Sequence, residues 1–105
     1  MRVLFDQGTP VPLRRRLPDH RVETAYERGW SDLHNSALLD RAEAEGFDVL
    51  VTTDQSLRHQ QNLAGRRLSV LVLLSTSWPR IEARAGRIAA AIERIGPGEC
   101  VEVAI

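Results

Sequence analysis

The sequence contains no lysine and only one cysteine. All 14 basic residues among its 105 are arginines, which excludes mechanisms that need a lysine amine, such as Schiff-base chemistry, a Walker A phosphate loop or the lysine of a receiver domain. Cys100 has no partner for an internal disulfide and offers no thiolate cluster for a metal. A lone cysteine is typical of proteins from reducing compartments, so we expect a cytoplasmic location.

Long hydrophobic runs and an excess of one charge are also absent. No uninterrupted apolar run is longer than Val70–Leu74, and the apolar start Val3–Phe5 stops at Asp6, so we expect neither a membrane span nor a targeting signal. Fourteen acidic residues balance fourteen basic ones. No global field would therefore hold the protein on nucleic acid or on an anionic membrane, and such binding needs a local patch.

Length and composition predict one folded domain over residues 1–105. With 43% hydrophobic and 27% charged residues, the chain has the composition of a globular protein, and two domains would each be too small to bury a core. The pattern predicts strands at 2–5, 21–25, 47–53, 68–74 and 100–105, and helices at 10–17, 35–45, 55–62 and 77–95. Strands joined by helical crossovers favour an α/β fold: a three-layer, doubly wound, mostly parallel sheet of four or five strands.

Polar residues mark the predicted helix starts. The hydroxyl of Thr9, before Pro10, is expected to cap the first helix, Asn35 the second and Ser77 the last. Trp30 and Trp78 lie at element boundaries, where we expect core anchors rather than platforms for base stacking.

Two aspartates stand at the carboxyl ends of predicted strands. Asp6 follows the first strand and Asp54 follows the strand over 47–53. Doubly wound sheets bind ligands beyond these strand ends, where the strand order changes direction. If the first strand lies between the second and the third, the two carboxylates face each other there, and Mg²⁺ or Mn²⁺ would relieve their repulsion. The alternative is that Asp54 only caps the helix that follows it.

Several segments of the sequence resemble one family of small domains. They are VLFD at 3–6, GWSD at 29–32 followed by Asn35 and the Leu38–Leu39 pair, GFDVLVTTD at 46–54, and Leu57 with QQNL at 60–63. Through these segments, which cover most of the chain, the sequence resembles the PIN-like domains found among toxin components of bacterial toxin–antitoxin modules and in related proteins of unknown function. PIN domains are metal-dependent ribonucleases. The resemblance therefore implies a cluster of carboxylates that holds Mg²⁺ or Mn²⁺ and activates water for hydrolysis of RNA.

The resemblance assigns catalytic and metal-binding roles to Asp6 and Asp54, which match the first and a late acidic position of the family pattern. The middle acid of that pattern has no match, because Ala37 stands where relatives carry Glu. Asp32, at the entrance to that helix, or Asp40, one turn into it, could replace it as a metal ligand, and Asp32 then joins the catalytic set. Two carboxylates support a two-metal site poorly, so one metal, weak catalysis and no catalysis all stay open.

Arginines and one histidine are candidates for contacts with RNA. The arginines are Arg14, Arg15, Arg16, Arg58, Arg66 and Arg67. They would form a rim that contacts phosphates if the first and third helices flank one cleft. The alternative is a solvated helix face, the usual role of charge runs. His59, near Asp54, is a candidate for RNA binding and acid–base chemistry, against the alternative of an incidental exposed histidine.

The residue pattern suggests three functions. The first is a metal-dependent ribonuclease, the toxin of a toxin–antitoxin pair, with RNA as substrate and an antitoxin protein as partner. The second is a PIN-like module without catalysis that binds RNA or a protein through the same cleft. The third, a phosphoacceptor receiver domain, is disfavoured because the chain has no lysine. The surface of the helix over 77–95 could also serve a homodimer, and no membrane partner is expected.

Overall fold

A five-stranded sheet forms the centre of the fold. The computed structural model of the chain describes residues 1–59, 63 and 65–105. Its strands are β1 (Arg2–Phe5), β2 (Arg21–Thr24), β3 (Val49–Thr52), β4 (Ser69–Leu73) and β5 (Cys100–Val103). They pair in the order β2-β1-β3-β4-β5, and every pairing is parallel. The prediction of an α/β fold with a parallel sheet is therefore confirmed.

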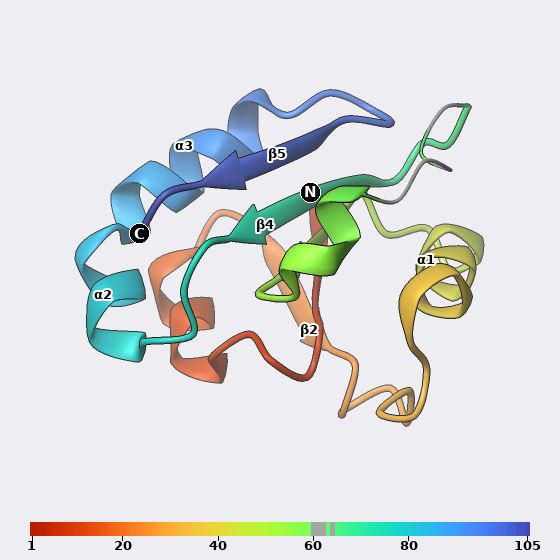
Figure 1. Cartoon of the computed structure of the whole chain (residues 1–105), viewed down its shortest axis with the longest axis horizontal. Coiled ribbons are helices and arrows are strands. Elements are labelled where there is room, and N and C mark those ends of the chain that lie inside the picture. Colours follow the sequence, from red (N-terminus) through yellow and green to blue (C-terminus); the bar gives the residue numbers. More distant parts are fainter. Residues whose placement is uncertain (60–62, 64) are drawn as a thin grey trace.

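Helices cover both faces of this sheet. They are the 3₁₀ helices η1 (Val11–Arg16) and η2 (Gln55–His59) and the α-helices α1 (Asn35–Ala44), α2 (Trp78–Ala83) and α3 (Ala85–Arg94). Figure 1 shows α1 on one side of the sheet and α2 and α3 on the other. Among the residues that the structure describes, no helix is long and apolar enough to cross a membrane.

Each face of the sheet has its own hydrophobic core. Successive side chains of a strand point to opposite faces, so Phe5 packs with η1, α2 and α3, whereas Leu4 packs with α1 and η2. Because both faces are covered, β3 and β4 are buried along their whole length, which explains their almost continuous apolar sequence. Trp30 is buried in the core beside α1, and Trp78 is half-buried against the other core.

Two helix caps differ from the prediction. Pro10, and not Thr9, takes the N-cap position of η1, because the Thr9 hydroxyl is engaged elsewhere, next to Asp6. Asn35 is the first residue of α1, and the N-cap is His34. The hydroxyl of Thr9 thus contacts Asp6 at the end of β1 and does not cap η1.

The single helix predicted over 77–95 is wrong, because the structure has two helices that meet at Arg84. Ser77 is the N-cap of α2 as predicted, although its side chain makes no capping hydrogen bond. Arg84 has φ −108° and ψ 13°, which departs from helical geometry and ends α2. Ile81 of α2 and Ile88 of α3 nevertheless reach the same core, so the apolar periodicity identifies the buried side chains but does not reveal the break.

Candidate active site at the strand ends

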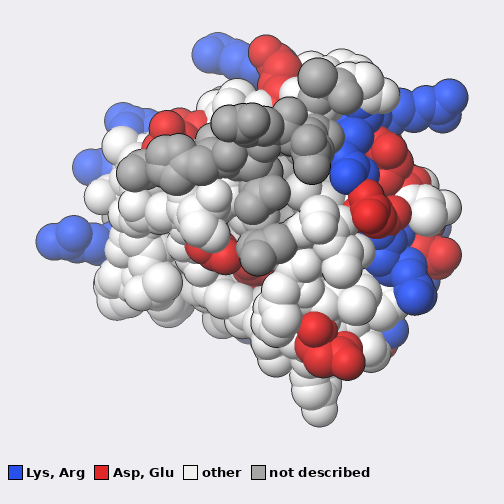
Figure 2. All heavy atoms as spheres, turned by 45° about the vertical axis from the view of Figure 1, so that its right-hand side comes forward, with Lys and Arg blue, Asp and Glu red and all other residues white. Residues whose placement is uncertain are grey.

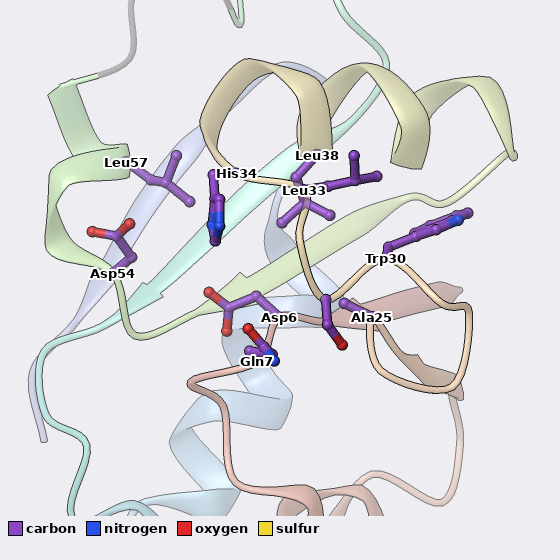
Figure 3. Close-up of a pocket in the computed structure, with 10 residues that line it drawn as sticks. Asp6, Gln7, Ala25, Trp30, Leu33, His34, Leu38, Asp54 and Leu57 are labelled. Carbon is purple, nitrogen blue, oxygen red and sulfur yellow. The ribbon is translucent and has the colours of Figure 1, made fainter.

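The strand order creates a switch point between β1 and β3. From β1 the chain goes to β2 on one side, and β3, β4 and β5 continue on the other. Ligands of such sheets bind beyond the carboxyl ends of the strands at this point. Asp6, which follows β1, and Asp54, which follows β3, line one cavity of about 60 Å³ there (Figure 3). We call it the acidic cavity, and it brings together the two aspartates that the sequence analysis singles out.

Asp6 is half-buried and is surrounded by hydroxyl groups. Thr9 Oγ1 lies 2.7 Å from Asp6 Oδ1, and the hydroxyl of Thr52 donates to Asp6 Oδ2. Burial raises the pKa of Asp6 above its ordinary value of 3.8, although hydrogen bonds from Thr52, Thr9 and Gly8 oppose the rise. The protonated acid is therefore more favoured here than at an exposed aspartate.

The Thr9 hydroxyl has one proton to donate, and two acceptor oxygens lie within hydrogen-bond distance of it. Its Oγ1 lies 2.8 Å from the backbone oxygen of Val51 and 2.7 Å from Asp6 Oδ1, but a hydroxyl donates only one hydrogen bond. A hydrogen bond from Thr9 to Oδ1 stabilises the ionised carboxylate and lowers the pKa of Asp6, but burial has the larger effect and the pKa stays raised.

Asp54 is exposed and also caps the helix that follows it. Its Oδ1 accepts hydrogen bonds from the Ser56 backbone N–H at 2.9 Å and from the Ser56 hydroxyl at 2.6 Å, so the capping role is present. The backbone N–H of Asp54 donates to Thr52 Oγ1 at 2.9 Å, and that hydroxyl donates in turn to Asp6. Thr52 therefore connects the two aspartates, and the capping role of Asp54 is compatible with its place in the cavity.

Three polar lining residues are missed by the sequence analysis. They are Gln7, Ser31 and His34. Figure 3 shows Gln7 and His34 beside Asp6, with His34 coming from the segment that precedes α1. The apolar part of the lining is formed by Ala25, Trp30, Leu33, Leu38 and Leu57. Gln7 could have been predicted as a lining residue, because it follows a strand-end aspartate in the sequence. His34 could not, because it reaches the cavity only through the packing of α1 beside β1 and β3.

The two candidates for the missing middle acid do not line the acidic cavity. Asp40 Oδ1 lies 2.6 Å from Arg66 Nη2, and Arg66 precedes β4 at the amino end of the sheet, opposite the ends that carry Asp6 and Asp54. Asp32 is exposed in the turn before α1, although its neighbour Ser31 does line the cavity. In the part of the chain that the structure describes, no third carboxylate lines the acidic cavity with Asp6 and Asp54.

The candidate phosphate contacts are spread over the molecule. Arg14 lines a second hollow together with Asp6. Arg15 is exposed on η1, and Arg16 on the same helix pairs with Glu82 at 3.7 Å. Figure 2 shows basic and acidic side chains next to one another at the right of that view, so this part of the surface has mixed charge.

The remaining candidates lie either at the far end of the sheet or outside the described residues. Arg66 and Arg67 precede β4, at the end of the sheet opposite Asp6. The backbone of Arg58 and His59 belongs to η2, but their side chains lie outside the described residues, as do Gln60, Gln61 and Asn62 of the family-like segment. Of the candidate arginines whose side chains the structure describes, Arg14 is the one that lines a hollow together with Asp6.

Asp6 and Asp54 are the candidate ligands of a divalent cation in the acidic cavity. Mg²⁺ is commonly bound through one or two carboxylates, and water and substrate phosphates fill its other positions. Asp6 and Asp54 supply such a pair. Within residues 1–59, 63 and 65–105, no group of three or more His, Cys, Asp or Glu side chains could hold a metal ion, so a two-metal centre is not supported. Since Asp6 must lose its proton to act as a ligand, metal binding competes with its protonation.

Comparison of the chain with protein-family models, with curated proteins and with solved structures found no match.

Proposed function

We propose that this protein is a PIN-like, metal-dependent ribonuclease of the cytoplasm and that the acidic cavity is its active site. The observation that carries the proposal is that Asp6 and Asp54 line one cavity at the switch point of a parallel sheet. The likeness of several segments to PIN-like toxins supports RNA as substrate and an antitoxin protein as partner.

The residues of the cavity have distinct roles in this proposal. Asp6 and Asp54 would hold one Mg²⁺ or Mn²⁺, and such an ion would supply an activated water and neutralise charge at phosphorus. The Thr52 hydroxyl orients Asp6, and the hydrogen bonds from Ser56 fix Asp54. His34 lines the same cavity, and in this proposal its imidazole gives a proton to the oxygen that leaves phosphorus.

Titration with Mn²⁺ and cleavage of a mixed RNA pool in the same buffers test the proposal. We expect wild-type protein to bind one Mn²⁺ in calorimetry and to cleave RNA, and we expect Asp6→Asn and Asp54→Asn to lose both. Asp19→Asn is the matched control, because Asp19 is exposed in the turn before β2, at the opposite end of the sheet. Wild-type protein that cleaves no RNA, or an Asp54→Asn variant that cleaves as fast as wild type, would refute the proposal.

A second function is favoured by one observation, the lack of a third metal-binding side chain in the described part of the site. In that case the protein is a PIN-like module that binds RNA without hydrolysing it. The same experiment distinguishes the two functions. The binding module shows no Mn²⁺ binding and no cleavage, and its affinity for RNA falls as the salt concentration rises.

A further inference from the structure

Two exposed hydrophobic side chains share a hollow next to the acidic cavity. Tyr26 is 77% exposed and Val11 is 52% exposed, and both line an open hollow of about 470 Å³, here called the Tyr26 hollow. Single exposed apolar side chains are ordinary. Here, however, two of the three large hydrophobic side chains that are exposed in the described part of the chain border one hollow, which points to a ligand.

The Tyr26 hollow adjoins the acidic cavity. Asp6 and Gln7 line both spaces. The acidic cavity, at about 60 Å³, has room for an ion with water but not for a nucleotide. A phosphate that reaches Asp6 must therefore leave its ribose and base outside. The Tyr26 hollow is an adjoining space of sufficient size.

Local hydrogen bonds hold the turn that carries Tyr26. The Thr24 N–H donates to Glu27 Oε1, and the Glu27 N–H donates to Thr24 Oγ1, both at 3.0 Å, which forms a reciprocal capping box. On the sheet side of the turn, the Ala25 N–H donates to the Phe5 oxygen at 2.8 Å. The backbone around Tyr26 is thus fixed before any ligand arrives, so little backbone freedom is lost on binding.

The charges beside Tyr26 are paired. Arg14 Nη2 lies 3.1 Å from Glu27 Oε2. The hydrogen bond from the Thr24 N–H and the one from Arg14 lower the pKa of Glu27, which keeps this carboxylate ionised. A guanidinium has five N–H donors, so Arg14 can hold Glu27 and still contact a phosphate. The hollow therefore combines an aromatic face, an aliphatic side chain and a cation with two carboxylates, Asp6 and Glu27.

We infer that the Tyr26 hollow is a subsite for one unstacked base of single-stranded RNA, with the base on the Tyr26 ring and the Gln7 amide at its edge. Aromatic rings stack with every base, whereas an amide that both donates and accepts hydrogen bonds can discriminate between them. A duplex is excluded because its bases are stacked inside the helix. The identity of the ligand as RNA rests on the proposed function.

A fluorine label at Tyr26 tests the subsite without any cleavage. Tyr26 is the only tyrosine, so growth with 3-fluorotyrosine puts a single ¹⁹F nucleus in the hollow. In EDTA, we expect a five-nucleotide single-stranded RNA to shift this resonance to saturation, and we expect inorganic tripolyphosphate to leave it in place. Tyr26→Phe is expected to keep the affinity of wild type and Tyr26→Ser to weaken it roughly tenfold. Both variants should fold, because the ring is exposed.

The outcomes separate the subsite from the nuclease. A resonance that RNA leaves unmoved, or a Tyr26→Ser variant with wild-type affinity for RNA, would overturn the subsite, even if the metal-loaded protein cleaves. Tripolyphosphate that moves the resonance as RNA does would also overturn it, because the hollow would then bind phosphate and not a base. A saturable shift of the wild-type resonance with RNA supports the subsite even if no cleavage is observed with Mn²⁺, provided that Tyr26→Ser, which carries no label, binds RNA more weakly than wild type in fluorescence anisotropy of a labelled RNA.

Discussion

The ionisation of Asp6 depends on its surroundings in the fold. Its strand-end position is visible in the sequence, but burial raises its pKa and hydrogen bonds from Thr52, far along the chain, and from Thr9 oppose the rise. Thr9 illustrates the limit of a local pattern, because a threonine before Pro10 predicts a helix cap. Its hydroxyl instead lies between Asp6 Oδ1 and the Val51 oxygen, an arrangement that only the pairing of β1 with β3 creates.

The raised pKa of Asp6 predicts how its replacement affects stability. Between 3.8 and the higher value in the folded protein, the folded state binds more protons than the unfolded state, so the free energy of unfolding falls as the pH rises through this interval. An asparagine at this position cannot ionise, and its amide can still accept from Thr52 and donate to Thr9. We expect Asp6→Asn to raise the melting temperature at neutral pH.

Thermal melts of both proteins between about pH 3 and pH 8 check this expectation, because the range starts below the ordinary aspartate pKa. The advantage of Asp6→Asn should shrink as the pH falls below the pKa of Asp6 in the folded protein. Two outcomes would contradict a raised pKa of Asp6 in the folded protein. One is an Asp6→Asn variant that melts below wild type at neutral pH, and the other is a difference in melting temperature that does not change with pH.

The helices and strands were largely predictable, because each buried strand and each amphipathic helix carries its own periodicity. What periodicity cannot show is how the ends of elements meet. The Phe47 ring packs edge-on against Trp30 with centroids 6.1 Å apart, and the Arg28 guanidinium lies 5.1 Å from the centroid of each ring. This cluster joins the turn after β2 to the segment before β3, and it positions Trp30 at the acidic cavity.

Two glycines at the junctions of elements test how closely neighbouring backbone segments approach each other. Gly29 and Gly98 have φ of 75° and 76°, but a Cβ at Gly98 would lie 3.0 Å from the Arg66 oxygen, whereas a Cβ at Gly29 would meet nothing within 4 Å. We expect Gly29→Ala to cost about 1–2 kcal/mol for the left-handed backbone and Gly98→Ala to cost more, because the neighbouring backbone must also move.

Urea denaturation of the two variants measures this difference. Gly86→Ala serves as a control of opposite sign, since Gly86 is in α3 and a Cβ there would meet nothing within 4 Å. It is expected to stabilise the protein by about 0.5 kcal/mol. Equal losses for Gly29→Ala and Gly98→Ala would mean that the close approach of the chain at Gly98 is not a constraint.

For the molecule as a whole, the balance of 14 basic and 14 acidic residues means that charge acts locally. Ion pairs such as Asp40 with Arg66 and Arg14 with Glu27 place opposite charges side by side, as the mixed surface in Figure 2 illustrates. The RNA binding that we propose would then depend on a few arginines near the cavity rather than on a basic face.

The salt dependence of RNA binding tests this local role. We expect Arg14→Gln to reduce the slope of log K against log salt by about 0.7, the effect of losing one phosphate contact with a single strand. Arg21→Gln is the control, because Arg21 is exposed at the start of β2, away from the strand ends. Fluorescence anisotropy of a labelled RNA at several salt concentrations provides the slopes, and equal slopes for both variants would rule out a phosphate contact by Arg14.

By itself, the sequence determined the alternation of strands and helices, the parallel α/β architecture and the two strand-end aspartates, because periodicity and turn chemistry are local properties of a chain. Only the tertiary structure decided which side chains share a site. The strand order puts β1 beside β3, which brings Asp6 to Asp54 and Thr52, leaves Asp40 at the other end of the sheet and places Tyr26 beside Asp6. These contacts join residues distant in sequence, and strand pairing and the packing of α1 create them.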